Sequence, residues 1–305
     1  MKVLVTGSTG FLGSECVRRL RDAGHDVTGT DKREGADIAL DLADTRGLDR
    51  LPSVDAVIHS AAVQYVSPDL PLIRRAAYFR RNNVEATRNL IRRYSGSGAH
   101  FVNVGTSMMY EQTGRRSYDE SCPWRGQGLY TASKIEAQRM VDAMPDPTAC
   151  VIPCIIAGEG RGGLFASLTG SIHRWGVAIW PGPGAHKIHL VHVRDAASLL
   201  VTVVTQRAVG RFNAASLEPL GIADWVDEIE TALHLSHVRR VRVPLIAVKS
   251  AAVLSGYRLL AREQLLMLNA AHVLSIDAAA ALGWAPAFTN AEIVRETARR
   301  LTASS

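Results

Sequence analysis

The sequence predicts an α/β fold, in which a doubly wound parallel sheet is joined to a smaller, mostly helical C-terminal domain. Short apolar runs alternate with segments of helical periodicity through the first half of the chain. The apolar runs are continuous, as in strands buried on both faces, and helices between such strands indicate right-handed βαβ crossovers. After about residue 216 the pattern changes to mostly helix, which predicts the second domain.

The expected strands and helices follow in chain order. Strands are expected at Lys2–Thr6, Asp26–Thr30, Ala36–Ala39, Ala56–His59, His100–Val104 and Ala149–Pro153. Helical patterns lie between them, at Leu12–Ala23, Leu70–Tyr94 and Leu129–Met144. A glycine-rich segment at 158–186 is typical of loops with a short helix. Further short strands are expected at 189–193, Phe212–Ala214 and Val238–Val243.

Composition narrows the class of protein. The 305 residues are 47% apolar and 21% charged, which is ordinary for a soluble globular protein. The net charge is +6, but basic residues are scattered rather than clustered with aromatic residues, so nucleic-acid binding is not expected. No apolar stretch approaches the ~20 residues that span a bilayer. The start MKVLVTG predicts a strand and a turn rather than a signal peptide, so a cytoplasmic protein is expected.

Neither a metal site nor a disulfide framework is expected. The four cysteines have no CxxC or His/Cys spacing, which argues against both. His186, His189 and His192 lie close in sequence, but positions 189 and 192 of a strand face opposite sides of the sheet.

The segment GSTGFLG, residues 7–13, follows the first predicted strand and opens the first predicted helix. Gly7 permits a tight turn, Gly10 lets the backbone approach a pyrophosphate, and Gly13 lets the helix pack closely on the strand. The N-terminus of the helix offers free N–H groups to the phosphates. This context predicts a Rossmann-type dinucleotide site, with Thr9, Phe11 and Leu12 completing the loop.

Asp31, 24 residues after Gly7, ends the second predicted strand. A carboxylate at this position hydrogen-bonds the ribose hydroxyls and repels a 2′-phosphate, which favours NAD. Lys32 and Arg33 follow directly and could attract that phosphate, so NADP stays an alternative.

Other strand ends are expected to complete the cofactor site. Asp41 and Leu42 follow the third strand, where they could meet the adenine. Small residues end the fourth strand and permit close approach of a dinucleotide: Ser60, Ala61 and Ala62. Pro153 ends the sixth strand and is assigned to the same site. His59 is expected to be a packed histidine rather than a catalyst.

The segment LYTASK, residues 129–134, places Tyr130 and Lys134 on one face of a helix. A tyrosine is a poor base near neutral pH, but a nearby ammonium group stabilises its phenolate. Lys134 could also hold the nicotinamide ribose, so both residues are expected to contact the cofactor as well as the chemistry.

Over residues 1–215 the chain resembles extended short-chain dehydrogenases/reductases, in the NAD-dependent epimerase/dehydratase and 3β-hydroxysteroid dehydrogenase-like group. The segments that carry the resemblance fall in order: GSTGFLG, HSAA, NNVEATRNL, VGTSMMY, YTASK and HLVHVRDAA. The resemblance implies that Thr106 is the hydroxyl of a Ser/Thr–Tyr–Lys triad, with Ser107 as the neighbouring alternative. It also implies a structural role for Asn83, and a homodimer formed through the helices near 70–94 and 129–144.

Met108 departs from the pattern of several relatives. Sugar-nucleotide 4,6-dehydratases typically carry an acidic pair where Ser107 and Met108 stand, and decarboxylating relatives carry a glutamate at the second position. Thioethers move no protons, although they suit an irregular apolar pocket wall; core packing is the alternative, and the favoured one for Met109. Either way, hydride transfer at one carbinol carbon is the chemistry that remains.

Two isoleucines bear on the substrate. Relatives that bind sugar nucleotides usually carry an arginine where Ile188 stands and an asparagine where Ile155 stands. Apolar residues at both positions predict a less charged, more lipophilic small-molecule substrate.

These observations predict an NAD-dependent oxidoreductase that interconverts a secondary alcohol and a ketone. An NDP-sugar 4-epimerase with tightly bound NAD is the alternative, and a dinucleotide sensor without catalysis is the third hypothesis. The predicted NAD-binding domain comprises residues 1–157 and about 187–215. The predicted substrate-binding domain comprises about 158–186 and 216–305.

Overall fold

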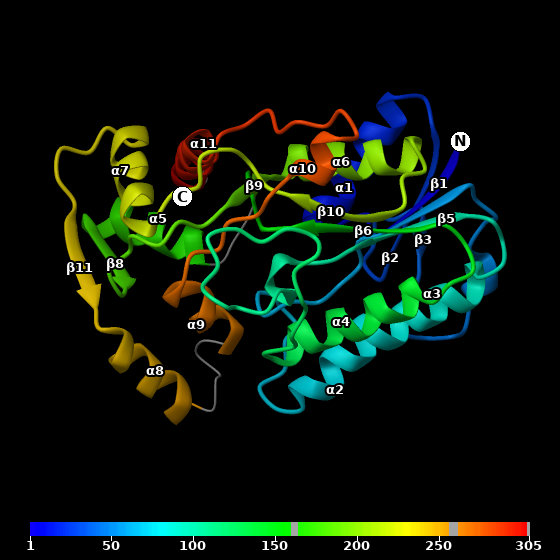
Figure 1. Ribbon diagram of the computed structural model, residues 1–305, viewed down its shortest axis with the longest axis horizontal. Coiled ribbons are helices and arrows are strands. Elements are labelled where there is room, and N and C mark those ends of the chain that lie inside the picture. Colours follow the sequence, from blue (N-terminus) through cyan, green and yellow to red (C-terminus); the bar gives the residue numbers. More distant parts are fainter. Residues whose placement is uncertain (160–163, 256–261, 304–305) are drawn as a thin grey trace.

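The computed structural model describes residues 1–159, 164–255 and 262–303 and confirms the doubly wound parallel sheet (Figure 1). Seven parallel strands are ordered β10-β6-β5-β4-β1-β2-β3. They are β1 (Lys2–Thr6), β2 (Asp26–Asp31), β3 (Ile38–Ala39), β4 (Ala56–His59), β5 (His100–Val104), β6 (Thr148–Pro153) and β10 (Gly210–Ala214). The strand order reverses between β1 and β4, and ligands of such sheets bind outside the carboxyl ends of the strands at this point.

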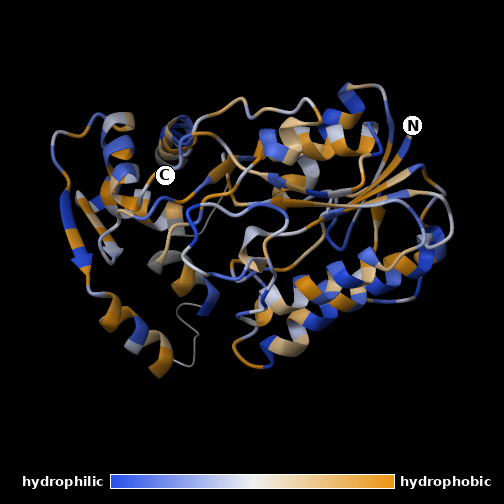
Figure 2. Cartoon of the chain, in the orientation of Figure 1, coloured by the Kyte–Doolittle hydropathy of each residue, from blue (hydrophilic) through white to orange (hydrophobic). Residues whose placement is uncertain are grey.

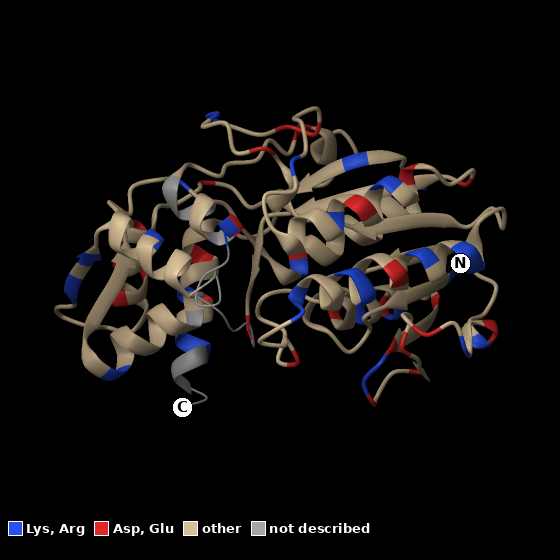
Figure 3. Cartoon of the chain, turned by 90° about the horizontal axis from the view of Figure 1, so that it is seen from below, with Lys and Arg blue, Asp and Glu red and all other residues tan. Residues whose placement is uncertain are grey.

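Helices cover both faces of the sheet. In Figure 1, α1 (Phe11–Asp22) and α6 (Val193–Thr205) lie on one face. The other face carries α2 (Arg75–Phe79), a π-helical segment at Arg80–Glu85, α3 (Ala86–Tyr94) and α4 (Leu129–Asp142). The strands of the sheet are largely hydrophobic, as the colouring in Figure 2 shows. Their apolar side chains are buried in the cores between the sheet and these helices. Charged residues of both signs are interspersed along the helices (Figure 3).

Three details differ from the sequence-based expectation. The helix expected from Leu70 begins at Arg75, because Pro68 and Pro71 interrupt the preceding segment and Arg74 has a left-handed backbone (φ 57°). The strand expected at Ala36–Ala39 is only two residues long. The segment expected to be loops with a short helix contains a full strand, β8 (Val177–Pro181), after the helix α5 (Leu164–Trp175).

The remaining elements lie mostly beyond the central sheet. Two parallel pairs are formed by β7 (Ile155–Ala157) with β9 (Leu190–His192) and by β8 with β11 (Arg239–Val243). The helices are α7 (Ile222–Ala232), α8 (Leu245–Leu254), α9 (Arg262–Asn269), α10 (Asp277–Ala280) and α11 (Asn290–Ala303). A separate apolar core joins α5, α7 and α11. The predicted domain boundaries stay a prediction. No helix among the described residues has the length and apolar character needed to cross a membrane.

Asp195 joins the C-terminal segment to the central sheet. Its side chain is 3% exposed and accepts backbone hydrogen bonds from Ala287 (3.0 Å) and Phe288 (3.2 Å). Since α6 packs on α1 and on the sheet, this carboxylate holds the segment before α11 against the α/β core.

We predict that Asp195→Ala lowers the free energy of unfolding by about 1.5–3 kcal/mol, because it removes the buried carboxylate that accepts hydrogen bonds from the backbone of Ala287 and Phe288. The matched control is Asp146→Ala. Asp146 also accepts from two backbone N–H groups, those of Gly96 and Gly98, but in an exposed setting, so a loss below about 1 kcal/mol is expected. Urea denaturation of both variants checks the difference, and equal losses would contradict this role.

Candidate active site

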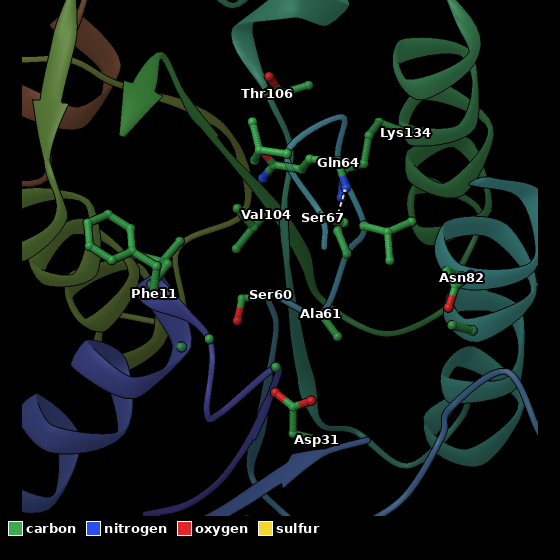
Figure 4. Close-up of a pocket in the computed structure, with 18 of the residues that line it drawn as sticks. Phe11, Asp31, Ser60, Ala61, Gln64, Ser67, Asn82, Val104, Thr106 and Lys134 are labelled. Atoms are coloured by element: carbon green, nitrogen blue, oxygen red, sulfur yellow. Dashed lines mark hydrogen bonds between the residues drawn. The ribbon is translucent and has the colours of Figure 1, made fainter. Parts of the chain in front are cut away.

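A cavity of about 550 Å³ opens along the carboxyl ends of the sheet strands at the point where their order reverses. Figure 4 shows Asp31 at one end of it, and Thr106 and Lys134 at the other. The structure brings together all the predicted site residues except Thr9 and Ile188: Gly7, Gly10, Phe11, Leu12, Gly13, Asp31, Lys32, Asp41, Leu42, Ser60, Ala61, Ala62, Thr106, Ser107, Met108, Tyr130, Lys134, Pro153 and Ile155 line the cavity. Their roles stay proposals.

The glycine loop fits a dinucleotide for steric reasons. Gly7 has φ 67°, and a Cβ on it would lie 2.9 Å from the backbone of Ala61. A Cβ on Gly13 would overlap the carbonyl oxygen of Gly7. No side chain caps the N-terminus of α1, where Gly10 is the N-cap residue. This uncapped helix N-terminus, with the positive end of the helix dipole, is suited to a phosphate.

Asp31 is held in place by the loop. Its Oδ2 accepts hydrogen bonds from the hydroxyl of Thr9 (2.8 Å) and from the Thr9 backbone (3.3 Å). Thr9 therefore orients the carboxylate without lining the cavity. Lys32 pairs with Asp69 (2.7 Å), so its charge is already compensated by a carboxylate. With Thr9 and Lys32 placed in this way, the carboxylate of Asp31 suits ribose hydroxyls better than a 2′-phosphate.

His59 lies buried behind the cavity, as expected for a packed histidine. Its two ring nitrogens hydrogen-bond the hydroxyls of Thr6 and Thr87, each at 2.8 Å. Burial, and then the charge of Lys134, lowers the pKa of His59 to about 3, so the ring is neutral. The hydroxyl of Thr6 also accepts from the backbone of Ala61 (3.1 Å), which fixes the small-residue turn after β4.

Tyr130 and Lys134 lie one turn apart on α4 and both line the cavity. Tyr130 is 5% and Lys134 is 4% exposed. The ring of Tyr130 packs against those of Tyr65 and Phe79, with centroids 6.2 and 6.0 Å away. Burial lowers the pKa of Lys134 to about 8, because the ammonium group loses hydration. A cation held there with little water is well placed to stabilise a negative oxygen.

Thr106 is the N-cap residue of a short 3₁₀ turn, Ser107–Met109. Its Oγ1 accepts from the backbone of Met108 (3.4 Å), which leaves the hydroxyl proton available to a ligand. Met108 packs beside Val63 and Tyr130 at the cavity wall, whereas Met109 is fully buried in the central core. Met108 is thus part of the pocket wall and Met109 part of the core, which are the two roles considered from the sequence.

Ile188 does not reach the cavity. It is 3% exposed within the core that joins α5, α7 and α11, and its backbone bridges to Leu220 and His272. Asn83 has the expected supporting position. Its amide hydrogen-bonds both backbone groups of Val63 (2.9 and 3.2 Å) and the hydroxyl of Ser133 (2.9 Å), so it joins the cavity wall to α4.

Two residues near the site lie outside any recognisable motif and were not predicted from the sequence. Glu263 of α9 accepts from the backbone of Thr131 (3.4 Å) at the start of α4 and hydrogen-bonds Tyr65; burial raises the pKa of its carboxyl group. Its carboxylate fills the space where a side chain at Gly128 would lie. His272 contacts Ser107 from behind. Both come from the C-terminal third of the chain, and only folding brings them to the site.

Among the residues that the structure describes, no group of three or more His, Cys, Asp or Glu side chains could hold a metal ion.

Comparison with known proteins agrees with this geometry. The model of the NAD dependent epimerase/dehydratase family matches residues 3–215. The chain is 29% identical to a UDP-glucose 4-epimerase of Streptomyces lividans over 232 residues, 71% of this chain and 62% of that protein. It is 26% identical to a 3-diazoavenalumate denitrifying reductase of a Streptomyces species, over 74% and 79% of the two chains. The solved UDP-glucuronic acid 4-epimerase of Bacillus cereus with NAD has the same fold, with a TM-score of 0.81, 16% identity and coverage of 100% and 99%.

We predict that Gly13→Ala weakens NAD binding by more than about tenfold, because the new methyl group displaces the loop that faces the phosphates. Gly170→Ala is the control, since a Cβ there meets no atom within 4 Å and alanine is favoured in a helix. Calorimetric titration with NAD measures both variants. Unchanged affinity in Gly13→Ala would argue against a phosphate at this loop.

A second prediction concerns the buried amine. Below about pH 8 both the folded and unfolded states carry the Lys134 proton, and the folded state bears the desolvation cost. Between about pH 8 and the ordinary value of 10.5 the folded state binds fewer protons, so stability contributed by this group rises with pH. We therefore expect cofactor-free Lys134→Met to be more stable than the parent protein at neutral pH, with a margin that shrinks above pH 8.

Thermal unfolding of the two proteins across this pH range provides the measurement. Lys249→Met removes an exposed lysine from α8 and should give a small difference that does not vary with pH. A margin for Lys134→Met that grows with pH would contradict the burial argument.

Proposed function

The chain belongs to the NAD-dependent epimerase/dehydratase family, and on this premise we propose that it interconverts a secondary alcohol and a ketone. The observation that carries the proposal is that Thr106 and Lys134 lie at the end of the cavity opposite Asp31, and that Tyr130, one helical turn before Lys134, lines the same cavity. One hydroxyl donor, one phenol and one buried cation are the set required to hold a reacting oxygen and exchange its proton.

NAD is the cofactor, and the residues of this chain fit its parts. The glycine loop and the N-terminus of α1 are suited to the diphosphate, and Asp31 to the adenosine ribose hydroxyls. Lys134 is suited to the nicotinamide ribose. When bound, the nicotinamide ring accepts or supplies the hydride, which is the redox chemistry that the side chains lack.

The side chains have the complementary task of moving one proton. In the oxidative direction Tyr130, as phenolate, removes the proton of the carbinol hydroxyl, while Thr106 donates a hydrogen bond to the same oxygen. The Lys134 ammonium group stabilises the phenolate. In the reductive direction Tyr130 returns its proton to the ketone oxygen. The bulky, apolar Met108 stands where dehydrating relatives carry an acid, so no second proton transfer is proposed.

A lipophilic substrate is supported by apolar side chains of the cavity wall. Met108, Ile155 and Ile156 line it. Among the described lining residues the basic side chains are Lys32, Arg33 and Lys134, and the first two belong to the Asp31 end. Ile188 gives no support, because it lies outside the cavity.

An NDP-sugar 4-epimerase is the second candidate, favoured by the names of several relatives. It would use the same triad twice and retain NAD between the two steps. A sensor without catalysis is disfavoured, since it has no need of a tyrosine and a buried lysine together in the cavity. A homodimer and a cytoplasmic location stay predictions.

The proposal is tested by turnover of a panel of hydroxysteroid and polyketide alcohols with NAD, beside a panel of UDP- and dTDP-sugars. We expect NADH to form with a lipophilic alcohol, and Tyr130→Phe to lower kcat by about 10²–10⁴-fold with little change in NAD affinity. Epimerisation of a sugar nucleotide by protein that releases about one NAD per chain on denaturation would favour the second candidate. Full activity of Tyr130→Phe would contradict both.

A further inference from the structure

Ser107 has a partner that the triad does not use. Its hydroxyl lies 2.7 Å from Nε2 of His272, and the side chain is 1% exposed while the residue lines the cavity beside Thr106. His272 lies 165 positions further along the chain. An imidazole directly behind a cavity-lining hydroxyl can act either as a proton acceptor or as a proton donor, and the two cases have opposite consequences for a ligand.

His272 is held rigidly. Its backbone N–H donates to the carbonyl of Lys187 (2.8 Å), and its carbonyl accepts from His189 (3.1 Å). The ring packs 5.6 Å from that of Tyr118 and is fully buried. Burial, and then His189, lowers the pKa of His272 to about 4, so at neutral pH the ring is neutral and carries one proton.

The orientation of the Gln112 side-chain amide determines which ring nitrogen of His272 carries that proton. Its amide nitrogen lies 3.1 Å from Nδ1 of His272 and 3.5 Å from the carbonyl oxygen of Tyr110. The amide atom near the Tyr110 carbonyl is the nitrogen, because the reversed amide would oppose its oxygen to that carbonyl oxygen. Nδ1 thus accepts from Gln112, and the ring proton lies on Nε2.

The direction of the Ser107 hydrogen bond follows. Nε2–H of His272 donates to Oγ of Ser107, which leaves the Ser107 proton to be donated elsewhere. Among the described residues the Ser107 hydroxyl has no hydrogen-bond partner other than His272. A serine that accepts from histidine is not activated as a nucleophile, because the base would have to receive its proton. The Ser107 hydroxyl in this arrangement is a hydrogen-bond donor of fixed orientation.

We infer that His272 and Gln112 are positioning residues that fix Ser107 as a hydrogen-bond donor to a second substrate oxygen, adjacent to the oxygen held by Thr106 and Tyr130. The inference rests on the proposed function for the position of the reacting oxygen. It assigns the substrate class more narrowly, as a lipophilic vicinal diol or hydroxy ketone. A substrate with a lone carbinol leaves the Ser107 proton unpaired in a buried site, which is unfavourable.

The tautomer is tested without any substrate. ¹⁵N-histidine labelling and long-range ¹H–¹⁵N correlation, with His272→Gln to assign the signals, give the protonation of each ring nitrogen. We expect a proton on Nε2 and none on Nδ1. Gln112→Glu supplies an acceptor to Nδ1 and should move the proton there. A proton on Nδ1 in the parent protein would overturn the inference.

The substrate class is tested by binding, so that it does not depend on turnover. A vicinal cyclohexanediol and cyclohexanol are titrated by ligand-observed NMR into the NAD-loaded protein. We expect the diol to bind about tenfold more tightly, as one hydrogen bond in a buried site permits. Ser107→Ala should abolish the preference for the diol. Gln112→Glu should also abolish it, because this variant is expected to move the ring proton of His272 to Nδ1. Thr169→Ala, a buried hydroxyl on α5, should retain it.

The outcomes separate this inference from the proposed function. Preference for the diol without NADH formation from any alcohol would retain the inference and overturn the proposed redox activity. NADH formation with equal affinity for both ligands, or a preference that survives in Ser107→Ala, would overturn the inference alone. Unchanged NAD affinity in each variant shows that a loss of preference does not arise from misfolding.

Discussion

The rest of the site depends on one constraint, the close approach of the glycine loop to the segment that follows β4. Gly7 lies so near Ala61 that neither backbone tolerates an added side chain between them. This contact joins the two halves of the sheet at the point where strand order reverses, and it leaves the N-terminus of α1 open. The dinucleotide cavity is the space that remains, and Asp31 bounds its far end.

The burial of Lys134 at the end of the cavity opposite Asp31 costs free energy. Lys134 is buried without a carboxylate partner among the described residues, and the lowered pKa of its amine expresses that cost. A charge with so little hydration interacts strongly with a nearby phenolate or ribose. A buried amine with a lowered pKa beside a cavity agrees with the general tendency of functional sites to hold perturbed ionisable groups.

The C-terminal third of the chain completes the site rather than merely covering it. Glu263 reaches the start of α4 and contacts Tyr65, which packs on Tyr130. His272 reaches Ser107 from a segment whose backbone pairs with residues 187–189. Ile188 belongs to this pairing, so its apolar character serves the packing that places His272 and not contact with a ligand. The substrate side of the site is thus set by pairing between distant segments.

The sequence alone determined the parallel sheet, the family and the cofactor. Of the site residues that it assigned, all but Thr9 and Ile188 line the cavity. These features depend on local patterns: glycines at fixed spacing after a strand, a carboxylate at the next strand end, and Tyr130 and Lys134 one helical turn apart. Only the tertiary structure decided that Ile188 lies outside the cavity, that Thr9 acts through Asp31, and that His272 and Glu263 reach the site. The contacts of His272 and Glu263 join residues more than 100 positions apart, and no local periodicity encodes a pairing made by packing across the whole chain.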